Sequence, residues 1–143
     1  MPMPRLRFRD PRTIPFDRLM RGFGLYTIAL GLLLFFPVTL DVLRIARPSH
    51  TAWTELSGFL VMFTGGVVLW CSRQVRARAA LLYWKGLLSV AVGLHLVWFG
   101  FFEYMGAMLG VFGLADLALG VIILTRLPRE AHAQPLQLLQ DRL

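Results

Sequence analysis

Hydrophobic residues run along this chain in long blocks, and polar residues interrupt them at only a few places. A helix needs roughly 20 mainly apolar residues to cross the hydrocarbon core of a bilayer. Four stretches meet this requirement, and they cover about 19–36, 52–71, 82–102 and 104–125. The last two form one apolar block that is too long for a single span, and we divide it at Glu103. The pattern predicts an all-α protein, an integral membrane, antiparallel bundle of four transmembrane helices.

Polar segments flank this helical region on both sides. We predict a transmembrane domain at 19–126, preceded by a basic tail at 1–18 and followed by a second tail at 127–143. Pro37 and Pro128 are expected to end the first and last spans, because a proline disfavours helical backbone at the residue before it.

The composition agrees with a membrane location, and the charges orient the chain. Charged residues make up 16% of the chain, against about a quarter in soluble domains. Of the 15 Lys and Arg residues, 13 lie toward one side of the predicted spans, and only Arg44 and Arg47 lie toward the other. Basic residues favour the cytoplasmic side, so we predict a multi-pass protein of the bacterial inner membrane with both termini in the cytoplasm. The net charge of +7 then reflects orientation and contact with anionic lipids, and no nucleic-acid partner is expected.

Glycine recurs at helical spacing within the predicted spans. Small residues allow membrane helices to approach closely, which is how such helices associate. We therefore predict helix-packing seams at Gly24, Gly31, Gly58, Gly65, Gly86, Gly93, Gly100, Gly106, Gly113 and Gly120. A groove for a cofactor along the same stripes is the alternative.

Asp116 is the sharpest candidate for a functional side chain, because a charge near the bilayer centre costs about 2.5–3.5 kcal/mol on insertion scales. It shares a helix face with Gly113 and Gly120, so it should point into the bundle. Lys85 is expected to extend to the headgroups, which leaves no cation at that depth and a largely protonated carboxyl. Either a neutral Asp116 fixes the helix register, or it serves as a proton or ligand site. The hydroxyls expected to bond it are those of Thr27, Thr64 and Ser89.

His95 lies midway along the third span, on the face opposite the glycines, near Trp98 and Phe99. An imidazole among aromatic rings could contact haem, a pigment or a quinone, but His50 and His132 lie outside the spans, so no second haem ligand is available in the membrane. The other interpretation is a hydrogen bond to a neighbouring helix or a lipid. The sequence requires no cofactor, and no motif for a metal site, a nucleophilic triad or a phosphate loop is present. We therefore expect no autonomous catalysis.

Two segments carry a family resemblance. The run Arg21-Gly22-Phe23-Gly24-Leu25-Tyr26, which leads to Gly31 and Pro37, and the run Gly113-Leu114-Ala115-Asp116-Leu117-Ala118 resemble small four-helix bacterial membrane proteins of the DoxX-like group. The likeness covers about 18–127. It implies the four-helix architecture and a role as an accessory or redox-associated subunit, and it carries over no catalytic residue.

The leading expectation is a small non-catalytic membrane protein that serves as an accessory or assembly subunit of a larger complex. Its expected partners are membrane lipids and either other membrane subunits or further copies of the chain. One alternative is a carrier of protons or small molecules that uses Asp116. Another is a redox-complex subunit that contacts quinone, haem or pigment near His95.

Overall fold

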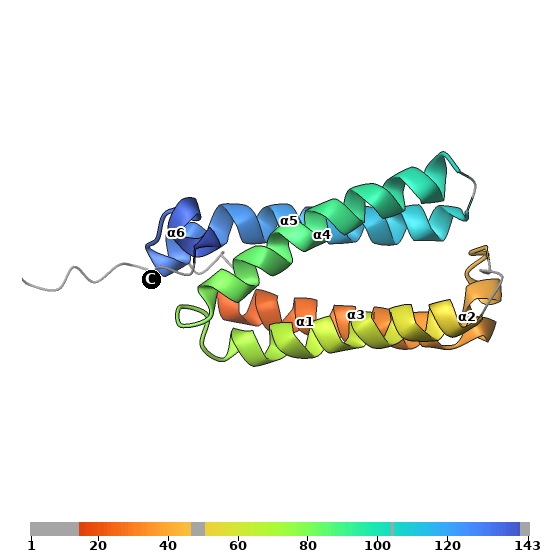
Figure 1. The fold of residues 1–143 in the computed structure, drawn as a ribbon, viewed down its shortest axis with the longest axis horizontal. Coiled ribbons are helices and arrows are strands. Elements are labelled where there is room, and N and C mark those ends of the chain that lie inside the picture. Colours follow the sequence, from red (N-terminus) through yellow and green to blue (C-terminus); the bar gives the residue numbers. More distant parts are fainter. Residues whose placement is uncertain (1–14, 47–50, 104, 141–143) are drawn as a thin grey trace, which may run out of the picture.

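The computed structural model describes residues 15–46, 51–103 and 105–140, and over these ranges the chain is helical with no strand. Its helices are α1 (Phe16–Phe35), α2 (Pro37–Val42), α3 (Thr51–Ser72), α4 (Ala79–Phe101), α5 (Ala107–Ala131) and α6 (Pro135–Leu139) (Figure 1). The four long ones, α1, α3, α4 and α5, are each long and apolar enough to cross a membrane. The prediction of an all-α protein with four candidate membrane spans is confirmed. Most of the predicted basic tail, at 1–14, lies outside the described residues.

Prolines act differently at the two predicted helix ends. α1 ends at Phe35, and Phe36 is extended before Pro37, which then occupies the first turn of α2. Pro128, in contrast, lies inside α5, which continues to Ala131 and ends at His132 in a left-handed conformation. A proline near a helix end removes a single N–H donor, so one more turn forms beyond it.

The long helices pack as two pairs, α1 with α3 and α4 with α5 (Figure 1). Glycine brings their backbones together: a Cβ atom on Gly31 would lie 2.7 Å from the carbonyl oxygen of Gly58, and one on Gly93 would lie 2.8 Å from that of Gly113. Any larger residue would push the helices apart. The glycines that meet between the two helices of a pair are Gly24 with Gly65, Gly31 with Gly58, Gly86 with Gly120, Gly93 with Gly113, and Gly100 with Gly110.

Gly106 has a different position from the one that its spacing predicts. It lies just before the first residue of α5, with a φ of 119°, and its Cα faces the carbonyl oxygen of Arg44. This backbone conformation is rare for residues with a side chain. Gly106 therefore shapes the turn between α4 and α5.

Large side chains fill the space between the two helix pairs at one end of the molecule, here called the core end. There the start of α1, the end of α3, the start of α4 and the end of α5 meet, and α6 covers them with the fully buried Leu138. The core consists of Phe16, Met20, Phe23, Val68, Cys71, Ala79, Leu82, Tyr83, Ile123, Leu127 and Leu138.

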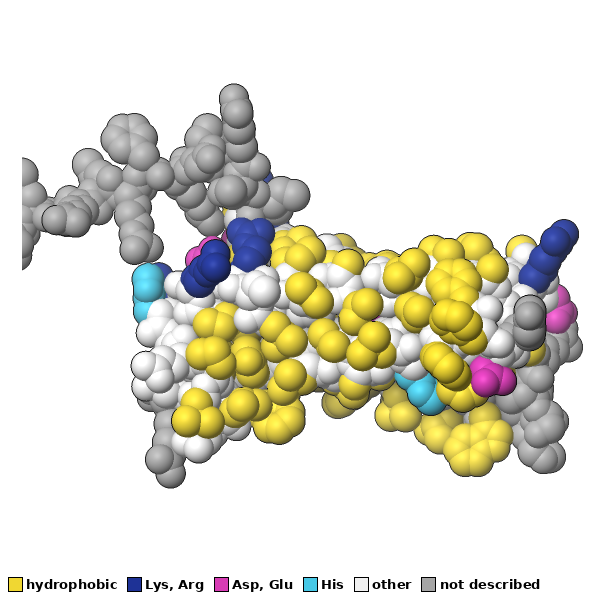
Figure 2. All heavy atoms as spheres, turned by 90° about the horizontal axis from the view of Figure 1, so that it is seen from above, with side chains coloured by type: hydrophobic (Ala, Val, Ile, Leu, Met, Phe, Trp, Pro, Cys, Tyr) yellow, Lys and Arg dark blue, Asp and Glu magenta, His cyan; other side chains and the backbone are white. Residues whose placement is uncertain are grey.

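The opposite end, here called the loop end, is joined by backbone contacts. The N–H of Ala46, after α2, donates a hydrogen bond of 2.8 Å to the carbonyl oxygen of Met105, in the turn before α5. Between the pairs at this end lies a cavity of about 300 Å³, lined by residues that include Leu34, Trp53 and Leu109. The charged side chains visible in Figure 2 gather at the two ends of the long molecule, and hydrophobic side chains cover the length between them.

Candidate functional site

Asp116 lies on α5 inside the helix bundle, with only 7% of its surface exposed. Gly113 and Gly120, one turn to either side, are also buried against α4. The helix face that carries the glycine seam therefore also turns the carboxylate inward.

Lys85 is the partner that the sequence did not reveal. Its Nζ donates a hydrogen bond of 2.7 Å to Oγ of Ser89, one turn further along α4, and it lies 5.0 Å from the centre of the Phe23 ring. Its ammonium interacts electrostatically with the carboxylate of Asp116. The expectation that Lys85 extends to the headgroups and that Asp116 has no cation nearby is therefore corrected.

The position of Lys85 in its helix explains why its side chain turns inward and does not extend to the headgroups. α4 begins at Ala79, so Lys85 is six residues inside the helix, roughly 9 Å along its axis. At that depth the hydroxyl of Ser89 and the ring of Phe23 replace part of the water that the ammonium loses. The charge of Asp116 adds a favourable electrostatic interaction, so the two opposite charges lower the cost that each would have alone.

Tyr26, from α1, completes this buried group. Its ring packs against that of Phe23, with the ring centres 6.4 Å apart, and its hydroxyl oxygen interacts electrostatically with Asp116. That oxygen is buried and has no hydrogen-bond partner among the residues that the structure describes. Tyr26, Lys85, Ser89 and Asp116 together form what we call the Lys85–Asp116 cluster, to which α1, α4 and α5 contribute.

The two threonines expected to bond Asp116 bond their own helices instead. The hydroxyl of Thr27 donates to the carbonyl of Phe23 at 2.9 Å, and that of Thr64 donates to the carbonyl of Val61 at 2.8 Å. Threonine readily makes such bonds within a helix. Of the three expected hydroxyls, Ser89 alone joins the cluster, and it does so through Lys85.

A groove between α3 and α4 leads to the cluster from the side of the bundle. Its volume is about 330 Å³, and Thr64, Val67, Trp84, Lys85 and Leu88 line it. About half of the surface of Trp84 and of Leu88 is exposed, so the groove opens toward the surroundings of the helices. Lys85 is its one charged lining residue.

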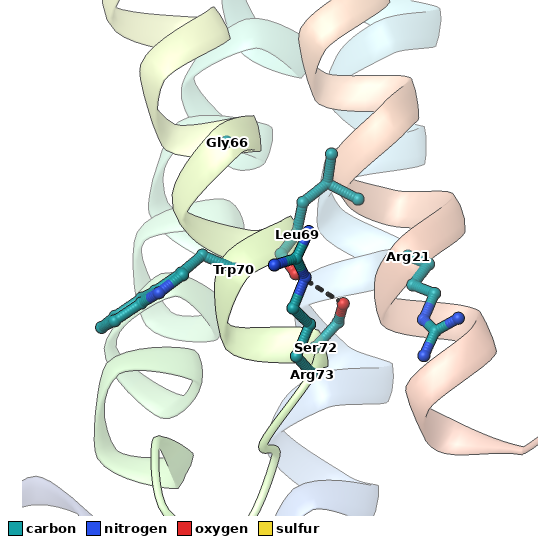
Figure 3. Close-up of a pocket in the computed structure, with 6 residues that line it drawn as sticks. All are labelled: Arg21, Gly66, Leu69, Trp70, Ser72 and Arg73. Carbon is teal, nitrogen blue, oxygen red and sulfur yellow. Dashed lines mark hydrogen bonds between the residues drawn. The ribbon is translucent and has the colours of Figure 1, made fainter.

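A second pocket, of about 600 Å³, lies between α1 and α3 (Figure 3). Arg21 projects from α1 and Arg73 follows the last residue of α3, while Trp70 points to the other side of α3 (Figure 3). The hydroxyl of Ser72 donates to the carbonyl of Leu69 at 2.7 Å and so stays on its own helix. The charged groups that line this pocket are both cationic.

His95 lies on the exposed face of α4 and does not join the buried cluster. Its ring centre is 4.5 Å from that of Phe99, and Trp98 packs against Phe102 at 5.1 Å. In the described part of the chain, no three His, Cys, Asp or Glu side chains are placed to hold a metal ion.

These features define the chain as a helical protein with four apolar helices, which suggest a multi-pass membrane protein, with the buried Asp116 and the partly buried Lys85 among them. No family model matches the chain, and neither a curated protein nor a solved structure matches it. The resemblance to the DoxX-like group therefore rests on the two segments quoted for it and receives no support from relatives.

Proposed function

We propose that this chain is a membrane-embedded carrier of protons or of a small molecule, and that the Lys85–Asp116 cluster is its binding site. Two residues of opposite charge inside a four-helix domain, the buried Asp116 and Lys85 with its bond to the buried Ser89, are the observation that carries the proposal. Ionisable residues at such positions are rare and belong mostly to transport pathways or ligand sites. A pair of apolar residues would join the helices at a similar or lower cost, so packing alone does not account for the two charges.

The proposed topology is an antiparallel four-helix bundle in the bacterial inner membrane with both termini in the cytoplasm. The order of the glycine contacts supports the antiparallel arrangement, because Gly24 meets Gly65 while the later Gly31 meets the earlier Gly58. The excess of arginines near the core end supports its assignment to the cytoplasmic side.

The cluster can exchange a proton without leaving an isolated charge. The ammonium of Lys85 and the carboxylate of Asp116 are neutral together, so an anion that enters the groove and pairs with Lys85 frees Asp116 to accept a proton. The hydroxyl of Tyr26 is buried and makes no hydrogen bond among the described residues, so it is available to bond the incoming group. Binding at this site is thereby coupled to protonation.

Proton flux into liposomes tests the proposal. Purified protein is reconstituted around a trapped pH-sensitive dye, and flux is followed after a pH step. Asp116→Asn should reduce the flux to that of protein-free liposomes while the helical circular dichroism is unchanged, since the amide keeps the size of the side chain. Asp17→Asn, a carboxylate at the start of α1, is the matched control and should keep the flux. Equal flux from the wild type and Asp116→Asn would exclude Asp116 as the carrier site.

Lys85 offers a second measurement, because it is the only lysine of the chain. Reductive methylation with ¹³C-formaldehyde labels its amine and the α-amino group, which give separate signals in NMR spectra. The pH dependence of the Lys85 signal should change on Asp116→Asn and stay the same on Asp17→Asn. An unchanged titration in both variants would contradict the electrostatic pairing.

A second candidate is the accessory subunit of a larger membrane complex, which the exposed aromatic side chains of α4 favour. Trp84, Trp98 and Phe102 are each more than half exposed, and His95 lies on the exposed surface of the same helix. A partner helix, or a quinone, haem or pigment in a redox complex, could cover this face. Purification in mild detergent should then yield co-purifying chains that His95→Ala/Trp98→Ala loses, and an absorbance spectrum tests for haem or pigment.

A further inference from the structure

Two glycines, Gly22 and Gly66, have no packing neighbour at their missing side chain within the part of the chain that the structure describes. A Cβ atom on Gly22 or Gly66 would meet nothing within 4 Å, whereas at every other glycine it would come closer than 3 Å to a neighbouring atom. A glycine in a helix costs up to about 1 kcal/mol relative to alanine. Neither Gly22 nor Gly66 recovers that cost through close packing of the helices.

Gly66 lines the pocket between α1 and α3, where the absence of a side chain leaves open space. The pocket has an apolar part, formed by Gly66 and Leu69, and a cationic part, formed by Arg21 and Arg73 (Figure 3). A side chain at position 66 would occupy space in the apolar part. The pocket thus combines two positive charges with an open apolar surface.

We propose that this pocket binds an anionic phospholipid, with the headgroup phosphate between Arg21 and Arg73 and one acyl chain along Gly66 and Leu69. Guanidinium groups pair with phosphate oxygens through two parallel hydrogen bonds. Among the described residues, no acidic side chain lines the pocket to compete for them. This inference requires that the helices span a membrane, but it does not depend on the carrier function.

The depth of the pocket fits a lipid. Arg73 immediately follows α3, and Trp70 is half exposed near the same helix end, where aromatic side chains typically mark the headgroup level. Gly66 lies six residues before the end of α3, roughly 9 Å deeper. The phosphate of one lipid molecule would thus lie at the level of Arg73 and its acyl chain at the level of Gly66.

Arg78 does not compete for the same phosphate. Its guanidinium carbon lies 3.4 Å from the centre of the Trp70 ring, and it donates a hydrogen bond to the carbonyl of Trp70. Figure 3 shows the Trp70 ring on the side of α3 away from Arg21. The headgroup is therefore held by Arg21 and Arg73.

Native mass spectrometry of the full chain in neutral detergent measures the affinity for the first bound lipid. Phosphatidylglycerol should bind roughly 25-fold more tightly than phosphatidylcholine, at about fivefold for each arginine. Arg21→Gln and Arg73→Gln should each lower the affinity for phosphatidylglycerol about fivefold. Arg129→Gln, which removes an exposed arginine near the end of α5, should leave it unchanged.

Gly66→Leu tests the acyl-chain part of the pocket, and Gly22→Leu is its matched control. Both positions have open space for a side chain, so both variants should fold and melt alike. Gly66→Leu should weaken the binding of both lipids, and Gly22→Leu should weaken neither.

Three results would overturn the proposal. Equal losses from Arg129→Gln and Arg73→Gln would show a diffuse electrostatic attraction in place of a pocket. Equal behaviour of Gly66→Leu and Gly22→Leu would remove the acyl-chain contact. Displacement of phosphatidylglycerol by an excess of glycerol phosphate or inorganic phosphate would assign the arginines to a soluble anion.

Discussion

The two ends of this helix bundle are held together in different ways. At the core end, side chains from all four long helices and from α6 interlock, and several of them, including Met20, Ile123 and Leu127, are fully buried. At the loop end, the bond from Ala46 to Met105 joins the two helix pairs, and a cavity of about 300 Å³ lies between them. The core end relies on interlocked side chains, whereas at the loop end a backbone bond joins the pairs and the buried Leu40 borders a cavity.

The difference shows where this molecule can change shape. Close-packed interiors resist rearrangement, whereas a cavity bordered by a few backbone bonds permits it. Lys85 and Ser89 belong to the first half of α4, close to the core end. The proposed binding site thus lies beside the rigid end, and we expect the helix pairs to move mainly at the loop end.

Gly100→Val should have the largest effect on stability, because the loop end depends on backbone approach. A Cβ atom on Gly100 would overlap the backbone of Gly110, so valine must separate α4 from α5. We expect a loss of about 3 kcal/mol, measured by denaturant unfolding in detergent. Gly22→Val, with open space at its Cβ, should lose far less. Similar losses in both variants would mean that helix propensity, and not the close contact, sets the effect.

Leu127→Ala should have the next largest effect and tests the core end. Leu127 is fully buried, so its truncation leaves a cavity and should cost about 2 kcal/mol in the same assay. Leu34→Ala is the matched change at the loop end, where the side chain already borders a cavity. We expect less than about 1 kcal/mol there. A larger loss for Leu34→Ala than for Leu127→Ala would reverse the comparison between the ends.

Ser57→Leu should have the smallest effect, and it should be stabilising. Ser57 is exposed and borders the cavity at the loop end, so a larger apolar side chain can fill space there. A gain of about 0.5–1 kcal/mol is expected, read as a higher midpoint of unfolding. A loss would indicate that the cavity is smaller in the membrane or is already filled by lipid.

The helices and their close contacts could be predicted from the sequence because both depend on short-range patterns. Apolar length marks a membrane span, and glycine spacing marks the face that packs. The same spacing also predicts that Asp116 points inward, where the structure places it. Gly106 differs because α5 begins only at Ala107, so Gly106 lies in the turn before the helix and not on its packing face.

The partners of Asp116 could not be predicted in this way. Lys85 has a long, flexible side chain, and its direction depends on the polar groups that the other helices place near it. In addition, α4 begins at Ala79, before the predicted start of the third span, so Lys85 lies deeper in the helix than the sequence indicates. Tyr26 lies on α1 and Asp116 on α5, so only the packing of the two helix pairs brings them into one cluster. The spacing leaves Gly66 outside the predicted seams, but only the structure shows the open space beside it.

Leu138 also bears on how the bundle is assembled. The side chain of this residue in α6 is fully buried in the core that α1, α3, α4 and α5 form. A chain cut before residue 138 would keep the four long helices and all their glycine contacts, yet it would lack part of the core that joins the two pairs. Pairing of the helices and closure of the core end are thus separable by truncation.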